Sequence, residues 1–357
     1  MTDYLILVIN PGSTSTKVAL YNNETLLKEK TLRHDVNELK HFQTIIDQID
    51  FRKNMILNLI NSSGYELKDI DVFVGRGGMT RPLSGGTYLI SQSMVDDLRS
   101  MKYGAHASAL GSIIAFDFSK EYNKKAYTVN PVVVDEFEDI SRISGLKQIE
   151  RKSIFHALNQ KAIALKFAQS INKTYEEVNV IVVHLGGGIS VGLHKKGRVV
   201  DVNNALGGDG PFSPERTGTI PTYPLVDICF SGLYNKEEVK KLLVGKGGIA
   251  SYLGTNDARI VENMVLSGDK EAKLVFDAMA YTVVKEIGAM YFAAKGDIDG
   301  ILITGGIAYS KYFTNLLKEY IDPIKLAIIY PGEDEMQALV DGALRVLNHK
   351  ETARVYE

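Results

Sequence analysis

The sequence predicts an α/β protein built from two related domains. A unit of strand, small-residue loop, strand, hairpin turn and strand occurs between Leu5 and Leu32 and again between Asn179 and Val202. Internal repetition on this scale indicates two related domains rather than a solenoid. The length agrees, because 357 residues exceed the usual size of one hydrophobic core.

Composition and charge exclude several classes of protein. Hydrophobic residues at 45% and charged residues at 24% are typical of a globular protein. The net charge is -2 with no basic stripe, so neither nucleic acid nor a membrane surface is an expected partner. The single cysteine, Cys229, excludes an internal disulfide and fits a reducing compartment. No signal peptide is recognisable, and no apolar run approaches the roughly 20 residues that span a bilayer, so a cytoplasmic location is expected.

The first half of the chain is expected to begin with three antiparallel strands. Hydrophobic alternation from Leu5 to Ile9 predicts a strand, which Asn10-Pro11-Gly12 ends. A second strand follows from Val18, and the Asn22-Asn23 turn leads into a third that reaches Leu32. The remaining expected elements are helices at 42–60, 94–101 and 106–122, and strands at 71–74 and 126–134.

The second half repeats the three strands after a helix expected at 154–171. The stretch from Leu206 to Pro224 lacks regular periodicity, which in a compact protein is typical of a functional loop. A helix over Asp269 to Lys295 would span roughly 40 Å. Its middle is apolar almost all round, so we expect it to be buried centrally. Further helices are expected at 225–231, 236–244, 308–320 and 335–349, and further strands at 301–304 and 324–329.

Three loops that follow strands are suited to anions. They read NPGSTSTK (10–17), HLGGGIS (184–190) and ITGGI (303–307). Glycines let the backbone approach an anion closely, and amides, hydroxyls and Lys17 supply donors. No P-loop motif occurs, and the glycines at 186–188 connect strand to strand, unlike a dinucleotide fingerprint. One such turn alone is common in packed sheets, but three in a duplicated framework predict nucleotide binding between two domains.

These loops and four further motifs resemble the acetokinase family, within the superfamily of acetate and sugar kinases, chaperone ATPases and actin. The further motifs are GRGG (75–78), RPLSGG (81–86), FSPERTG (212–218) and PGEDE (331–335). The resemblance covers essentially the whole chain. Pro11 after Asn10, Gly187 where acetate kinases usually have Asn, and the shorter chain favour the branch of butyrate and branched-chain fatty-acid kinases.

The resemblance implies two duplicated actin-like or ribonuclease H-like domains of βββαβαβα type that flank an interdomain cleft. Residues 1–150 plus 336–357 would form an N-terminal acyl- and phosphate-binding domain, and residues 151–335 a nucleotide-binding domain. The implied reaction is reversible transfer of the γ-phosphoryl group of ATP to a short-chain carboxylate, giving acyl phosphate and ADP, with Mg²⁺. Butyrate is the expected acceptor, with isobutyrate or other branched acids as further substrates. A homo-oligomer, dimeric or larger, is also implied.

Such chemistry makes definite demands on a site. A carboxylate with a pKa of about 4–5 is already ionised at neutral pH, so no general base is required. The difficulty is to bring two anions together and to neutralise the transferring phosphoryl group, which calls for arginines, Mg²⁺ and backbone amides.

The resemblance assigns catalytic residues one by one. Arg76 and Arg216 match the arginines that meet the carboxylate and the phosphoryl group, and a planar guanidinium suits planar anions. His156 and His184 match histidines that donate to the transferring phosphoryl group. Asp135 matches an aspartate near Mg²⁺ and the substrate carboxylate. Nucleotide and phosphate contacts are assigned to Asn10, Ser13, Ser15, Lys17, Gly186, Gly187, Gly188, Asp257, Arg259, Gly305, Gly306 and Ile307.

The Mg²⁺-associated glutamate is assigned to Glu335, with contact through water as Mg²⁺ prefers. Glu333 is the alternative, because PGEDE permits a second register. Either glutamate has a plain structural interpretation as a favourable charge at a helix N-terminus. Asp135 also has a plain structural interpretation, as a helix cap. His156 has one too, as a histidine of a helix that packs against a domain surface.

Three other functions stay open at the level of sequence. An acetate or propionate kinase would share the motifs, and a non-catalytic nucleotide sensor would share the loops. A sugar kinase needs an aspartate base for a hydroxyl acceptor, for which Asp135 would be the candidate. Arg76 and Arg216 suit an anionic acceptor better.

Overall fold

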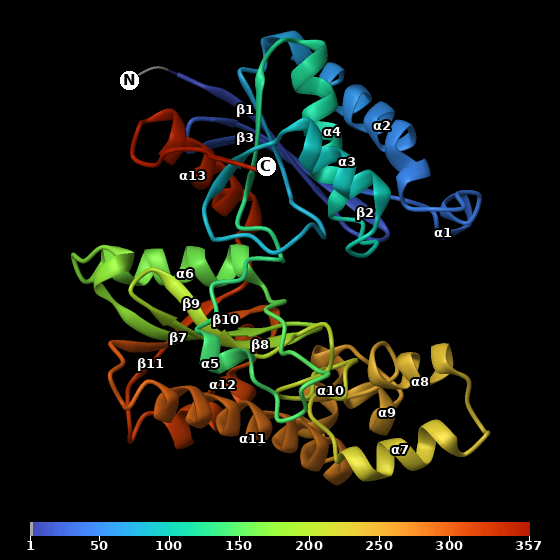
Figure 1. Ribbon diagram of the computed structural model, residues 1–357, viewed down its shortest axis with the longest axis vertical. Coiled ribbons are helices and arrows are strands. Elements are labelled where there is room, and N and C mark those ends of the chain that lie inside the picture. Colours follow the sequence, from blue (N-terminus) through green and yellow to red (C-terminus); the bar gives the residue numbers. More distant parts are fainter. Residues whose placement is uncertain (1–2) are drawn as a thin grey trace. The chain divides into compact units, whose positions relative to one another are not determined.

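The computed structural model, which describes residues 3–357, contains two β-sheets, one in each of two units of the chain (Figure 1). The first unit consists of Met1–Val134 with Asp334–Glu357, and the second of Asp135–Glu333. Along the chain the units meet after residues 134 and 333, whereas the sequence interpretation placed the boundaries after residues 150 and 335.

The sheet of the first unit has the order β12-β5-β6-β4-β1-β2-β3. Strands β1, β2 and β3 are antiparallel neighbours, whereas β4 runs parallel to β1 and β6 parallel to β4. The bounds are β1 Leu5–Pro11, β2 Ser15–Asn22, β3 Thr25–Arg33, β4 Val72–Gly75, β5 Thr87–Leu89, β6 Lys125–Val129 and β12 Arg354–Val355.

The sheet of the second unit has the order β11-β10-β7-β8-β9. Strands β7, β8 and β9 are antiparallel neighbours, and β10 and β11 continue the sheet in parallel with β7. Order and direction therefore match the run β6-β4-β1-β2-β3 of the first unit, which confirms the predicted duplicated α/β fold. The bounds are β7 Asn179–Leu185, β8 Ile189–Lys195, β9 Arg198–Val202, β10 Gly300–Gly305 and β11 Ala327–Pro331.

In the first unit, the alternation of strand side chains sends neighbouring residues to opposite faces of the sheet. Leu7 and Ile9 of β1 join a core with Ile56 of α2 and Ile113 of α4. The last helix, α13, packs against β1, β4 and β6. The helix bounds are α1 Val36–Leu39, α2 Ile49–Asn61, α3 Gln92–Ser100, α4 Ala109–Glu121 and α13 Glu335–Leu347, with 3-10 turns at Ile46–Gln48 and Leu67–Asp69.

The sheet of the second unit is covered on both faces, by α6 on one side and α11 on the other (Figure 1). Val180 and Val182 pack with Phe167 of α6, whereas Ile181 and Val183 belong to the core that contains α11. The helix bounds are α5 Asp139–Arg142, α6 Ala157–Ser170, α7 Thr222–Phe230, α8 Lys236–Leu243, α9 Ile249–Leu253, α10 Ala258–Leu266, α11 Lys270–Ala293 and α12 Lys311–Ile321, with 3-10 turns at Tyr175–Glu177 and Gly306–Tyr309.

The prediction that the long helix is buried centrally holds for only one of its sides. Helix α11 buries Phe276 and Val283, but Leu274 is 71% exposed and Phe292 is 78% exposed. Only one side of the helix faces the sheet, so its other apolar side is exposed in the chain. Within the part of the chain that the structure describes, no helix, α11 included, has the length and hydrophobicity needed to cross a membrane.

Two predicted elements are shorter than expected. The helix expected at 42–60 begins as a regular α-helix only at Ile49, because the Asp47 carboxylate accepts a hydrogen bond from the Thr44 amide and holds the preceding residues in a turn. The strand expected at 126–134 ends at Val129, where Asn130 adopts a positive φ of 40° and Pro131 lacks an amide donor.

Candidate active site

The loop between β1 and β2 is a tight turn that is held from behind by a buried arginine. The Gly12 amide donates to the Ser15 carbonyl at 2.8 Å. Arg52 of α2 donates to the carbonyls of Gly12 and Ser15, each at 2.9 Å, and to that of Ser13 at 3.2 Å. Because these carbonyls face the guanidinium, they point away from the exposed side of the loop, where the Ser13 side chain lies.

Arg52 is fully buried, and its contacts are neutral oxygens. It also donates to Thr16 Oγ1 at 3.0 Å and to Gln48 Oε1 at 2.8 Å. Burial lowers the pKa of Arg52 to about 10, so it stays charged at neutral pH. Thr16 Oγ1 in turn lies 2.9 Å from His34 Nε2, and burial, with the charge of Arg52, lowers the pKa of His34 to about 4.

Sequence reasoning missed Arg52, although a signal was present. It occupies the same helical face as the buried Ile49 and Ile56, where an apolar residue is expected. A charged residue on the apolar face of a helix needs buried partners, and the loop carbonyls are those partners.

Arg76 follows β4 and forms an ion pair with Glu335, the first residue of α13. Asn10, at the end of β1, donates to the same carboxylate oxygen of Glu335 at 2.8 Å. The structure thus brings three predicted site residues of the first unit together. Lys17, by contrast, pairs with Glu29 of the neighbouring strand at 2.9 Å.

Asp135, predicted near Mg²⁺, is held by an arginine. Arg142 donates to both carboxylate oxygens of Asp135, at 2.7 and 2.8 Å. Among residues 3–357 no group of three or more His, Cys, Asp or Glu side chains is placed to hold a metal ion. Mg²⁺ commonly binds through one or two carboxylates, water and substrate phosphates, so a single carboxylate such as that of Glu335 fits this ion, whereas Asp135 has both oxygens engaged.

His156 and His184 lie face to face in the second unit. Their ring centroids are 3.7 Å apart and the planes differ by 8°. His184 is a buried residue near the end of β7, and its Nδ1 lies 2.8 Å from Asn159 Oδ1. Its Nε2 lies 3.1 Å from Glu333 Oε1. His156 precedes α6, and its Nδ1 lies 2.9 Å from Ser190 Oγ on β8.

The loop that contains Arg216 packs against the glycines between β7 and β8. Ser213 Oγ donates to the Gly187 carbonyl at 2.6 Å, and Arg216 donates to the Ala205 carbonyl. A Cβ on Gly188 would collide with the Arg216 guanidinium. Burial lowers the pKa of Arg216, and its Nε, although buried, has no hydrogen-bond partner within the described chain. A buried, incompletely paired guanidinium beside a glycine loop is suited to an anion.

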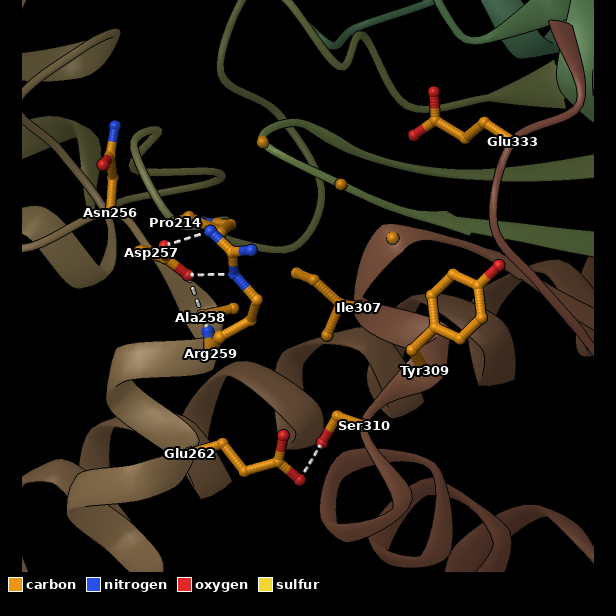
Figure 2. Close-up of a pocket in the computed structure, with 13 residues that line it drawn as sticks. Pro214, Asn256, Asp257, Ala258, Arg259, Glu262, Ile307, Tyr309, Ser310 and Glu333 are labelled. Carbon is orange, nitrogen blue, oxygen red and sulfur yellow. Dashed lines mark hydrogen bonds and ion pairs between the residues drawn. The ribbon is translucent and has the colours of Figure 1, made fainter.

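A pocket of about 740 Å³ opens beside these glycines (Figure 2). Six of the predicted nucleotide residues line it, on three separate segments of the second unit. The lining residues are Gly186, Gly187, Pro214, Asn256, Asp257, Ala258, Arg259, Glu262, Gly306, Ile307, Tyr309, Ser310 and Glu333.

The walls of the pocket are set by local hydrogen bonds. Asp257 caps α10 by accepting from the Arg259 amide at 2.9 Å, and it also pairs with the Arg259 guanidinium (Figure 2). That pairing lowers the pKa of Asp257 to about 2. On the neighbouring wall, Ser310 donates to Glu262 at 2.7 Å (Figure 2). Gly305 has a φ of 94° and touches the backbone of Leu185, so a side chain there would be strained.

Sequence reasoning singled out only part of this lining. Tyr309 and Ser310 lie just beyond the ITGGI loop and Glu262 lies one turn after Arg259, and no local pattern marks them. The helix α10, which carries Glu262, was not predicted either.

Residues 144–330 match the model of the acetokinase family. The chain belongs to the acetokinase family. As an acetokinase it is a kinase whose phosphoryl acceptor is a carboxylate, and members of this family use ATP or ADP with Mg²⁺.

Three solved structures share the acetokinase fold with this chain. The acetate kinase of Porphyromonas gingivalis is 16% identical, with a TM-score of 0.77 over 96% of this chain and 100% of that one. The acetate kinase of Entamoeba histolytica is 14% identical, with a TM-score of 0.76 over 95% and 99%. A propionate kinase from Francisella tularensis is 17% identical, with a TM-score of 0.73 over 95% and 98%.

Proposed function

We propose that this acetokinase phosphorylates butyrate with ATP to give butyryl phosphate and ADP, reversibly, in the cytoplasm. The observation that carries the nucleotide half of the proposal is the pocket, because six residues assigned to ATP from sequence motifs line one cavity. The volume of about 740 Å³ lies within the range of small-molecule sites. The lone cysteine, Cys229, is consistent with a reducing compartment.

The acceptor needs recognition of an anion rather than a base. Arg76 is the proposed ligand of the carboxylate, and Arg216 is proposed to neutralise the transferring phosphoryl group. His156 and His184 are proposed to donate to phosphoryl oxygens. When bound, Mg²⁺ would neutralise phosphate charge, and Glu335 would hold it through water. In-line transfer then depends on positioning and electrostatic stabilisation by these side chains.

Butyrate is preferred to acetate in this proposal because Pro11, Gly187 and the shorter polypeptide resemble the butyrate branch of the family. Measuring acyl phosphate as hydroxamate across straight and branched C2 to C6 acids tests the choice. We expect kcat/KM for butyrate to exceed that for acetate by about tenfold or more, since each methylene in an apolar pocket is worth roughly 1–3 kcal/mol. A profile that peaks at acetate or propionate would make the chain an acetate or propionate kinase.

The same assay separates the other candidates. If none of the acids is phosphorylated in the presence of ATP and Mg²⁺, although the chain still binds ATP, the result would indicate a nucleotide sensor.

We also propose a homo-oligomer, supported by the exposed apolar side of α11, where Leu274, Tyr281 and Phe292 are each more than half exposed. Light scattering of the purified chain gives the mass that tests this.

A further inference from the structure

A series of buried hydrogen bonds in the second unit ends on His156. We call its four members the buried relay; they are Tyr175, His194, Gln160 and Ser190. His194, Gln160 and Ser190 are each 0% exposed. Water therefore does not compete for these bonds, and the donors and acceptors must satisfy one another.

The orientation of the Gln160 amide sets the direction of the relay. Gln160 Nε2 donates to the Ser190 carbonyl at 3.1 Å, and a carbonyl can only accept. The other end of the amide, Oε1, lies 3.0 Å from His194 Nε2. Because Oε1 is also an acceptor, the proton of the His194 ring must lie on Nε2.

The other nitrogen of His194 is then an acceptor. Burial lowers the pKa of His194 well below its usual value, so the ring is neutral and Nδ1 carries a lone pair. Tyr175 Oη lies 2.7 Å from this Nδ1 and donates to it.

At the other end, the Ser190 hydroxyl accepts from Gln160 Nε2 at 2.8 Å. Because Ser190 is fully buried, the proton of its hydroxyl group also needs an acceptor. His156 Nδ1, at 2.9 Å, is that acceptor. A neutral imidazole that accepts at Nδ1 carries its proton on Nε2.

We propose that the buried relay fixes the proton of His156 on Nε2 and so keeps this N–H as the donor to a phosphoryl oxygen. The relay residues are positioning residues, because they act through His156. The catalytic part of the inference rests on the proposed phosphoryl transfer, whereas the placement of the proton rests on hydrogen bonds alone.

The stacked neighbour of His156, His184, has the opposite arrangement at Nδ1. Thr304 donates to the Gly332 carbonyl at 3.0 Å and accepts from Asn159 Nδ2 at 3.4 Å. Asn159 therefore turns Oδ1 towards His184 Nδ1, which must donate. In these two parallel rings 3.7 Å apart, Nδ1 thus accepts in His156 but donates in His184, each set by its own buried partner, and His184 Nε2 faces Glu333 Oε1.

Nitrogen NMR of the full chain tests the proton placement directly. The chain has 7 histidines, so selective ¹⁵N labelling gives a simple spectrum, and His156→Gln and His184→Gln assign the two rings by loss of signal. At pH 8 without substrates we expect a protonated Nε2 and an unprotonated Nδ1 for His156, and a protonated Nδ1 for His184. A proton on Nδ1 of His156 would overturn the relay.

Variants of the relay test its consequence. Ser190→Ala removes the donor to His156 Nδ1, so we expect mixed tautomers at His156 and a fall in kcat of about 10–100-fold, as for other supporting hydrogen bonds. The KM for ATP should change by less than about twofold, because ground-state binding is not involved. Ser190→Thr keeps the hydroxyl and should restore both readouts.

The control is Thr314→Val, which removes another buried hydroxyl of the same unit; it should change neither the spectrum nor kcat. If Ser190→Ala leaves the His156 signals or kcat unchanged, the inference fails. If the unaltered chain makes no acyl phosphate from any acid, the proposed function fails instead, and the spectra still decide where the proton lies.

Discussion

Arg76 forms an ion pair with Glu335, a residue 259 positions further along the chain. The pair joins the end of β4 to the first residue of α13 within the first unit, and Asn10 donates to the same carboxylate oxygen. A helix N-terminus stabilises the Glu335 carboxylate. The guanidinium has several N–H donors in a planar fork, so pairing with one carboxylate leaves donors for a second anion.

Replacing Arg76 by alanine should slow phosphoryl transfer strongly while leaving nucleotide binding intact. We expect kcat to fall by about 10²–10³-fold, the usual cost of removing one donor to a developing charge. ATP affinity, measured by calorimetry, should stay close to that of the unaltered chain, because Arg76 does not line the pocket. Arg99→Ala, which removes an exposed arginine of α3 paired with Asp117, is the control and should keep full activity. Equal loss of ATP binding and activity in Arg76→Ala would contradict the assignment.

The two glutamates of PGEDE should differ in their effect on Mg²⁺. Glu335 contacts Arg76 and Asn10, whereas Glu333 lies against His184 and lines the pocket. We expect Glu335→Gln to raise the Mg²⁺ concentration for half-maximal activity by about tenfold, as loss of a supporting carboxylate commonly does. Glu333→Gln should leave that concentration unchanged even where it alters kcat. The reverse result would favour the second register.

A side chain at Gly306 should block the pocket without disturbing the fold. A Cβ there would have no heavy atom within 4 Å, so Gly306→Leu projects into open space that the nucleotide is proposed to fill. We expect the KM for ATP to rise by about tenfold, equivalent to 1.4 kcal/mol, with an unchanged melting temperature. Gly288→Leu, on α11, also has open space at its Cβ and is the matched control. An unchanged KM for ATP in Gly306→Leu would place the nucleotide elsewhere.

Arg52 should matter for stability and for the first phosphate loop. Arg52→Met removes the buried charge but leaves the carbonyls of Gly12, Ser13 and Ser15 without their donor. The second effect should dominate, because each unsatisfied buried group costs about 1–3 kcal/mol. We expect urea denaturation to show a loss of about 2 kcal/mol for the first unit, together with lower kcat.

Lys53→Met is the control for Arg52, since Lys53 is the next residue of α2 and lies 3.8 Å from Asp117. Loss of such a surface pair costs about 0–1 kcal/mol. Equal stability of Arg52→Met and Lys53→Met would show that the loop does not depend on the buried guanidinium.

The repeated strands and the loops could be predicted from the sequence, because both are local patterns. Alternating apolar residues and glycine turns mark β1 to β3 and β7 to β9, and six motif residues do meet at one pocket. The burial of α11 was overestimated, because an apolar sequence alone does not show which side of a helix packs against another element.

The polar supports of the site were not predictable in the same way. Arg52 and His194 act through partners that lie 40 and 34 positions away in sequence, at Gly12 and Gln160. No spacing rule connects such residues. Only the folded arrangement shows that each is fully buried and which atom it faces.

Stability should fall with acidity because of His34. Its pKa of about 4 in the folded chain lies below the value of about 6.5 expected when unfolded. The unfolded chain therefore takes up a proton between these values while the folded chain does not, so the contribution is complete above about pH 6.5 and is lost as the pH falls towards 4. We expect the free energy of unfolding to fall by about 2 kcal/mol across this window, given about 1.4 kcal/mol for each pH unit and partial solvent screening.

His34→Gln keeps an acceptor for Thr16 but does not titrate, so urea midpoints at pH 7 and pH 4.5 should differ less in this variant than in the unaltered chain. Identical differences in the two proteins would mean that His34 is not the group responsible.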